Sequence, residues 1–96
     1  MTVLTMDNRE IAAVFREIAD RLQSRKDNWF KIRAYRRAAD SIESADEAVM
    51  RLVAEGRLDE IAGVGEAIAK KIGELAATGR LDYLERLKAE ASEEAG

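Results

Sequence analysis

Hydrophobic residues recur at helical spacing along most of the chain. In the first segment they repeat at intervals of three and four residues, with polar residues between them: Ile11, Val14, Phe15, Ile18 and Leu22. This spacing predicts an amphipathic helix. The preceding Asp7-Asn8-Arg9-Glu10 resembles a capping box, in which Glu10 reaches back to the N-cap backbone. The polar run 23–28 should end the helix.

A second helix is predicted from Asn28 or Trp29 to about Glu43. Rotation by about 100° per residue groups its apolar positions on one side, namely Ile32, Ala34, Tyr35, Ala38, Ala39 and Ile42. The other side carries Arg33, Arg36, Arg37 and Asp40. Most charged faces are simply solvated. Three arginines with little acid between them also suit phosphate groups, because the guanidinium fork matches phosphate geometry.

The second half of the chain predicts shorter helices. One covers residues 46–54 and ends at Gly56, a glycine suited to the position after a helix. A longer one begins at or just after Gly65, with Ile68, Ile72, Leu75 and Ala76 on one face, and ends at Thr78-Gly79. A last helix uses Leu81, Leu84 and Leu87 as its inner face.

The stretch 58–72 organises this half, as a short helix, a glycine-bracketed turn and the longer helix. Gly63 and Gly65 allow positive φ and close approach of another backbone. The first amides of the following helix lack intrahelical partners and lie at the positive end of its dipole. Amides of Gly63, Val64 and Gly65 are therefore candidates to bind a phosphate oxygen. The alternative is a plain helix–helix joint in which the glycines only cap.

Composition narrows the possible chemistry. The chain has 96 residues, without proline, cysteine or histidine, and is rich in helix formers. We therefore expect one all-α domain, a compact bundle of about five to six short helices. Disulfides, thiolate chemistry, a zinc site and a histidine base are excluded, and no cofactor is required. No membrane span or signal peptide is visible, so we expect a cytoplasmic protein.

Charge is unevenly distributed although the net charge is only −3. Basic residues crowd positions 21–37, opposed only by Asp27, whereas acidic residues collect at 43–47 and 90–94. One basic side on an otherwise acidic molecule keeps a nucleic-acid partner possible.

Three segments together resemble a known family. NWFKIRAYRRAA at 28–39, IAGVG at 61–65 and TGRL at 78–81 are similar to the N-terminal helix-hairpin-helix domain of family X DNA polymerases. The bacterial members with a C-terminal phosphoesterase domain look closest, and the animal repair polymerase beta shares the segment. The resemblance covers about residues 8–89, which leaves 1–7 as a frayed N-terminus and 90–96 as a frayed acidic C-terminus.

The resemblance implies a monomeric module that grips the 5′ side of gapped, nicked or single-stranded DNA in base excision repair. Polymerase and phosphoesterase domains would then lie in the same natural chain. Hairpin amides would bind a backbone phosphate, with Arg33, Arg36, Arg37, Lys70 and Phe30 as further DNA contacts. A monovalent cation, Na⁺ or K⁺, would be held by the main-chain carbonyls of Asp59, Ile61 and Val64.

The resemblance also implies an abasic-site or deoxyribose-phosphate lyase. Its Schiff-base lysine falls on Lys71, with Lys31 and Tyr35 in the same pocket. From the residues alone, Lys71 borders the apolar face while Lys70 points outward, so Lys71 is the more sheltered amine. The alternative is a lysine that snorkels at the edge of the core. Two interpretations are likewise open for Phe30: its ring could stack on a base, or it could fill the core.

Some positions depart from the family pattern. Ala62 and Trp29 stand where proline is frequent, Glu66 would repel a nearby phosphate, and lysines of the animal enzymes are replaced at Asp59, Ala67 and Tyr83. These departures predict weaker binding of a 5′ phosphate. A module that binds protein and not DNA is the competing interpretation, with the basic helix as plain surface. Polymerase activity is excluded because no carboxylate triad for two-metal chemistry is evident.

Overall fold

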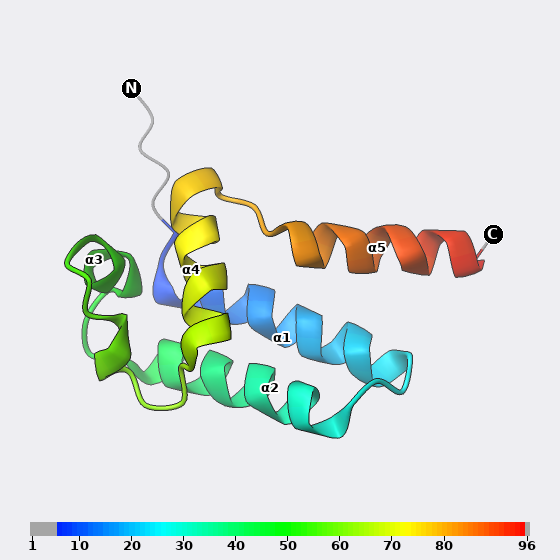
Figure 1. Cartoon of the computed structure of the whole chain (residues 1–96), viewed down its shortest axis with the longest axis horizontal. Helices are drawn as coiled ribbons and strands as arrows, with labels where there is room; N and C mark the ends of the chain where they lie inside the picture. Colours follow the sequence, from blue (N-terminus) through cyan, green and yellow to red (C-terminus); the bar gives the residue numbers. More distant parts are fainter. Residues whose placement is uncertain (1–5, 96) are drawn as a thin grey trace.

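The computed structural model describes residues 6–95, and every regular element within that range is helical (Figure 1). The elements are α1 (Asn8–Ser24), α2 (Trp29–Ser44), α3 (Val49–Ala54), the 3₁₀ turn η1 (Leu58–Glu60), α4 (Glu66–Thr78) and α5 (Asp82–Ala95). The all-α prediction is confirmed. The predicted fraying of residues 1–5 and 96 lies outside the described range, and the helical backbone of 90–95 leaves fraying there a prediction.

Helices α1 and α2 lie side by side as an antiparallel pair (Figure 1). The predicted capping box is present: the Asp7 carboxylate accepts from the Glu10 N–H at 2.8 Å, and the Glu10 carboxylate accepts from the Asp7 N–H at 3.1 Å. The alternating apolar face of α1 is buried against that of α2. Small residues such as Ala19, Ala38 and Ala39 are fully buried in this interface, so the two backbones approach closely.

Helix α3 begins later than predicted, at Val49 instead of Asp46. The reason is a cap supplied by α1. The Asn8 side chain donates to the Glu47 carbonyl at 2.9 Å and accepts from the Val49 N–H at 2.8 Å. This pair of bonds holds the chain on either side of Ala48, which is extended, and satisfies the amide of Val49 at the helix start. The cap comes from a residue about forty positions away, so local pattern could not reveal it.

Helices α3 and α4 end where predicted, at the left-handed Gly56 and Gly79. Helix α4 then packs into the same core through Ile68, Ile72 and Leu75. Helix α5 follows with Leu84 and Leu87 buried, and Arg25 of the α1–α2 loop pairs with Glu90 of α5. Residues 6–95 thus fold around one continuous core.

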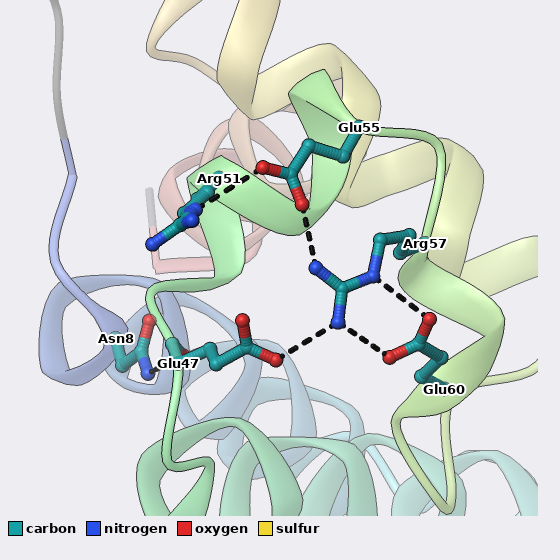
Figure 2. Close-up of polar contacts among 6 residues, drawn as sticks. All are labelled: Asn8, Glu47, Arg51, Glu55, Arg57 and Glu60. Atoms are coloured by element: carbon teal, nitrogen blue, oxygen red, sulfur yellow. Dashed lines mark hydrogen bonds and ion pairs between the residues drawn. The ribbon is translucent and has the colours of Figure 1, made fainter.

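Arg57 ties η1 to the end of α3 (Figure 2). Its guanidinium lies 2.6 Å from the Glu55 carboxylate, 2.8 Å from that of Glu60 and 3.1 Å from that of Glu47. Arg51 also pairs with Glu55 at 3.1 Å. These contacts lower the pKa values of Glu55 and Glu60, chiefly through hydrogen bonds from Arg57. The network fixes the path of the chain immediately before the glycine turn.

We predict that Arg57→Gln lowers stability at neutral pH but much less in acid. A carboxylate with a depressed folded-state pKa contributes stability above its unfolded pKa and loses that contribution as the pH falls. Without these contacts the side-chain pKa of Glu55 and of Glu60 would be 4.5. Thermal melts from pH 7 to pH 3 should therefore show the midpoints of wild type and variant converging below pH 4.5. A gap that stays constant over this range would contradict the role given to the network.

Candidate functional site

A groove of about 650 Å³ separates the exposed side of α2 from the glycine turn. Phe30, Arg33 and Arg37 line it from successive turns of α2, and Gly63, Val64 and Gly65 line it from the opposite wall. The structure therefore brings two of the predicted arginines, the predicted aromatic residue and the predicted turn to one place. The interval of three to four residues between the α2 side chains puts them on one helical face.

The turn reaches α2 because Gly63 has no side chain. A Cβ placed there would lie 3.1 Å from Ser41 Oγ and 3.2 Å from Arg37 Cγ, tighter than ordinary van der Waals contact. Gly63 also has φ +85°, a conformation that disfavours other residues. Gly65 has φ −85° and open space around it, so it does not need to be glycine for either reason. Only one of the two predicted glycines uses its conformational freedom.

The amides of the turn differ in what they can bind. The Val64 N–H already donates to the Ile61 carbonyl at 3.3 Å. Within residues 6–95, the N–H groups of Gly63 and Gly65 have no protein acceptor, and the first bond of α4 is from Ala69 N–H to the Gly65 carbonyl. The amides of Gly63 and Gly65, two residues that line the groove, are therefore available to an anion, whereas the predicted Val64 amide is occupied.

The arginines of α2 also separate into two groups. In the described part of the chain neither Arg33 nor Arg37 forms an ion pair, so both guanidinium groups are available to a ligand. Arg36 instead turns toward α1, where it pairs with Asp20 at 3.2 Å and with Gln23. The structure does not bring Arg36 to the turn.

A second hollow of about 520 Å³ lies beside the groove. Lys31, Tyr35 and Lys71 all line it, as the resemblance implies, and it shares Ala34, Gly63 and Gly65 with the groove. Burial raises the pKa of Tyr35 to about 12, so its phenol is a hydrogen-bond donor at neutral pH. Glu66 lines this hollow and not the groove. Its negative charge therefore offsets the charge of the two lysines more than that of the groove arginines.

Lys70, Phe30 and Ala34 are all exposed in the structure. Lys70 is exposed on α4 and lines neither hollow. Phe30 is 77% exposed, which excludes the core-filling alternative. The helical pattern predicts Ala34 on the apolar side of α2, but in the structure it is exposed and lines both hollows. A small residue there leaves the room that both hollows need.

The carbonyls predicted to hold a monovalent cation lie on η1 and the turn. The Ile61 carbonyl accepts the Val64 N–H, which leaves it one lone pair for an ion. Asp59 belongs to η1, and Val64 to the groove wall. The cation stays a prediction. No cluster of carboxylates suited to a metal occurs among the described residues.

Comparison with known families gives this geometry a context. Residues 6–81 match the helix-hairpin-helix domain family, which is most of the chain. The chain belongs to the helix-hairpin-helix domain family. In this helix-hairpin-helix domain the matched span runs from the cap of α1 through α4 and stops one residue before α5. None of the curated proteins compared with the chain matches it.

Membership indicates nucleic-acid binding in general and does not single out the polymerases. The part of the helix-hairpin-helix domain that the structure describes has no helix long and apolar enough to cross a membrane.

Tyr83 is the pocket residue that the motifs did not identify. It comes from α5, beyond both the TGRL segment and the matched family span. Its only signal in the sequence is that it stands where the animal polymerases have a lysine.

We predict that Gly63→Ala destabilises the domain whereas Gly65→Ala does not. The left-handed backbone at position 63 costs a residue with a side chain about 1–2 kcal/mol, and the new Cβ would press on Ser41 and Arg37. At position 65 the change should stay within about 0.5 kcal/mol, because a small loss of capping preference is offset by lower entropy of the unfolded chain. Urea unfolding of both variants measures the difference. Equal losses at the two positions would contradict the close approach of the turn to α2.

Proposed function

We propose that this domain binds the sugar-phosphate backbone of DNA, without reading sequence, in the groove between α2 and the glycine turn. The observation that carries the proposal is the juxtaposition of two arginines and two amides across that groove. Within residues 6–95, Arg33 and Arg37 form no ion pair, and the amides of Gly63 and Gly65 have no acceptor. Guanidinium groups and helix-start amides both favour an anion. Contacts of this kind hold phosphate and carry no base information.

We further propose that the domain is the DNA-gripping module of a family X repair polymerase, acting at the 5′ side of a gap or nick. The three matched segments of the sequence support this finer assignment. The hollow beside the groove supports it too, because Lys31 and Lys71 there suit the phosphate of a strand end. The exposed ring of Phe30 at the groove offers a surface for an unpaired base.

We predict that Arg33→Gln combined with Arg37→Gln weakens DNA binding about tenfold or more at low salt. Loss of two phosphate contacts should also reduce the slope of log K against log salt by about 1–2, because fewer counterions are released. Fluorescence anisotropy on a gapped duplex at several salt concentrations gives both quantities.

The matched control is Arg9→Gln combined with Arg80→Gln, which removes the same charge from exposed positions outside the groove. Wild-type affinity and slope in this control would assign the effect to the groove. If both double variants weaken binding equally, only net charge matters. If wild type binds no DNA, the groove is not a DNA site. That result would favour the competing interpretation, a module that binds protein.

A second activity is favoured by one observation, the gathering of Lys71, Lys31 and Tyr35 around one hollow. We propose that Lys71 there acts as an abasic-site lyase. Its neutral amine attacks the C1′ aldehyde of the open sugar, and water leaves as the imine forms. A water molecule then takes the C2′ proton, and the electron pair forms the C1′–C2′ double bond of an enamine. As the C3′–O bond breaks and the 3′ phosphate leaves with its electron pair, the enamine pair forms the C2′–C3′ double bond and the imine at C1′ is restored. Hydrolysis of the imine returns the amine.

We predict that borohydride traps a covalent adduct with abasic DNA in wild type and in Lys70→Met, but not in Lys71→Met. Borohydride reduces only an imine, so the adduct reports the Schiff base itself. Lys70 is the matched control because it is the neighbouring lysine, exposed on the same helix. The adducts are counted by denaturing gel electrophoresis. Adduct formation that survives in Lys71→Met would assign the chemistry to another amine.

A further inference from the structure

Three aromatic rings from three helices run from the core to the wall of the second hollow. Phe15 of α1 is fully buried and stacks on Tyr35 of α2, with ring centroids 6.0 Å apart. Tyr35 stacks in turn on Tyr83 of α5 at 6.2 Å. Tyr83 thus packs on a core aromatic residue, and buried Leu84 and Leu87 anchor its helix. Its ring therefore has a fixed position.

The face of the Tyr83 ring, and not its hydroxyl, makes the polar contacts. The Lys71 Nζ lies 5.2 Å from the ring centroid, and the Arg86 Cζ lies 5.9 Å from it. The hydroxyl is buried, and it has no hydrogen-bond partner among the described residues. A cation at this distance from an aromatic face is attracted by the ring quadrupole. The ring is therefore the part of Tyr83 that acts on its neighbours.

We infer that Tyr83 is a positioning residue whose ring holds the Lys71 ammonium at the wall of the hollow, ready to bind the terminal 5′ phosphate of a DNA strand. The inference rests on the proposed function, since it names the residue that prepares that site for its ligand. A terminal phosphate monoester carries more negative charge than an internal phosphodiester, so it gains more from a fixed ammonium. Lys31 supplies a second ammonium in the same hollow, and Glu66 offsets one of the two.

Helix α5 is required for this arrangement. The family match ends at Leu81, yet the ring that contacts Lys71 comes two residues later. The amine and its support thus come from different helices, α4 and α5. A ring-held ammonium binds phosphate as it stands, whereas it must first lose its proton to attack an aldehyde. The contact with Tyr83 therefore favours the charged amine, the form that binds phosphate, and not the neutral amine that lyase chemistry needs.

The first test compares gapped DNA with and without a 5′ phosphate. We expect Tyr83→Leu to reduce the ratio of the two affinities about two- to fivefold, the range of one cation–π contact. Tyr83→Phe should retain the wild-type ratio, because it keeps the ring and removes only the unpartnered hydroxyl. In a Lys71→Met background, Tyr83→Leu should have no further effect on the ratio. A reduced ratio in that background, or in Tyr83→Phe, would overturn the inference.

The second test needs no DNA. Lysines are methylated reductively with ¹³C-formaldehyde, which preserves their charge, and the Lys71 signal is assigned by its loss in Lys71→Met. A ring face next to the amine should shift this signal upfield in wild type and in Tyr83→Phe, and Tyr83→Leu should abolish the shift. A Lys71 signal at the position of exposed lysines in wild type would overturn the inference.

The two measurements distinguish failures. A shifted signal without any DNA binding would refute the proposed function, and with it the phosphate part of the inference, while the ring contact stands. DNA binding that ignores the 5′ phosphate would leave the groove proposal intact and refute the inference alone. Far-UV circular dichroism and thermal melts of each variant show that the fold is retained.

Discussion

The contact between Gly63 and α2 determines the shape of the candidate site. Because a hydrogen atom stands where other residues have a Cβ, the turn reaches Ser41 and Arg37. That approach sets the width of the groove and brings the free amides opposite the arginines of α2. The Arg57 network supports it from the other side by fixing η1, the element that leads into the turn. A wider gap would leave the same residues as ordinary surface.

Ion pairing decides which basic residues remain available to a ligand. Six arginines have carboxylate partners within the described structure, namely Arg16, Arg21, Arg25, Arg36, Arg51 and Arg57. Arg33 and Arg37 have none there, although they belong to the same helix as Arg36. Net charge is therefore a poor guide to binding in this protein. Among the described residues, Asp20 pairs with Arg36, while the two arginines that line the groove, Arg33 and Arg37, keep their charge without a carboxylate partner.

Much of the fold follows from short-range pattern. The capping box at Asp7, the ends of α3 and α4 at glycine and the start of α4 after Gly65 are all local signals, and the structure has them. What the pattern missed depends on distant partners. Asn8 delays the start of α3 from about forty residues away. Arg36 was grouped with Arg33 by helical position, but Asp20 of α1 draws it away.

The candidate site was predictable to a similar extent, and for the same reason. Motifs identified the turn and the basic face, and helical spacing placed Phe30, Arg33 and Arg37 together. Neither could show that Ala34 lines both hollows, because alanine suits a core as well as a surface. Tyr83 was recognised only as a departure from a family lysine. Its stacking on Tyr35 depends on how α5 packs, and no residue near Tyr83 in the sequence encodes that.

Opposite faces of α2 separate stability from binding. Ile32, Ala38, Ala39 and Ile42 are buried against α1, while Phe30, Arg33 and Arg37 face the groove. Changes on the groove side remove no core contacts, so affinity can vary without loss of the fold. Tyr35 is the exception, since its ring belongs to the core on one side and lines the hollow on the other. Through Tyr35 and Tyr83 the packing of the core sets where the Lys71 amine lies, and the chemistry of the hollow is coupled to stability there.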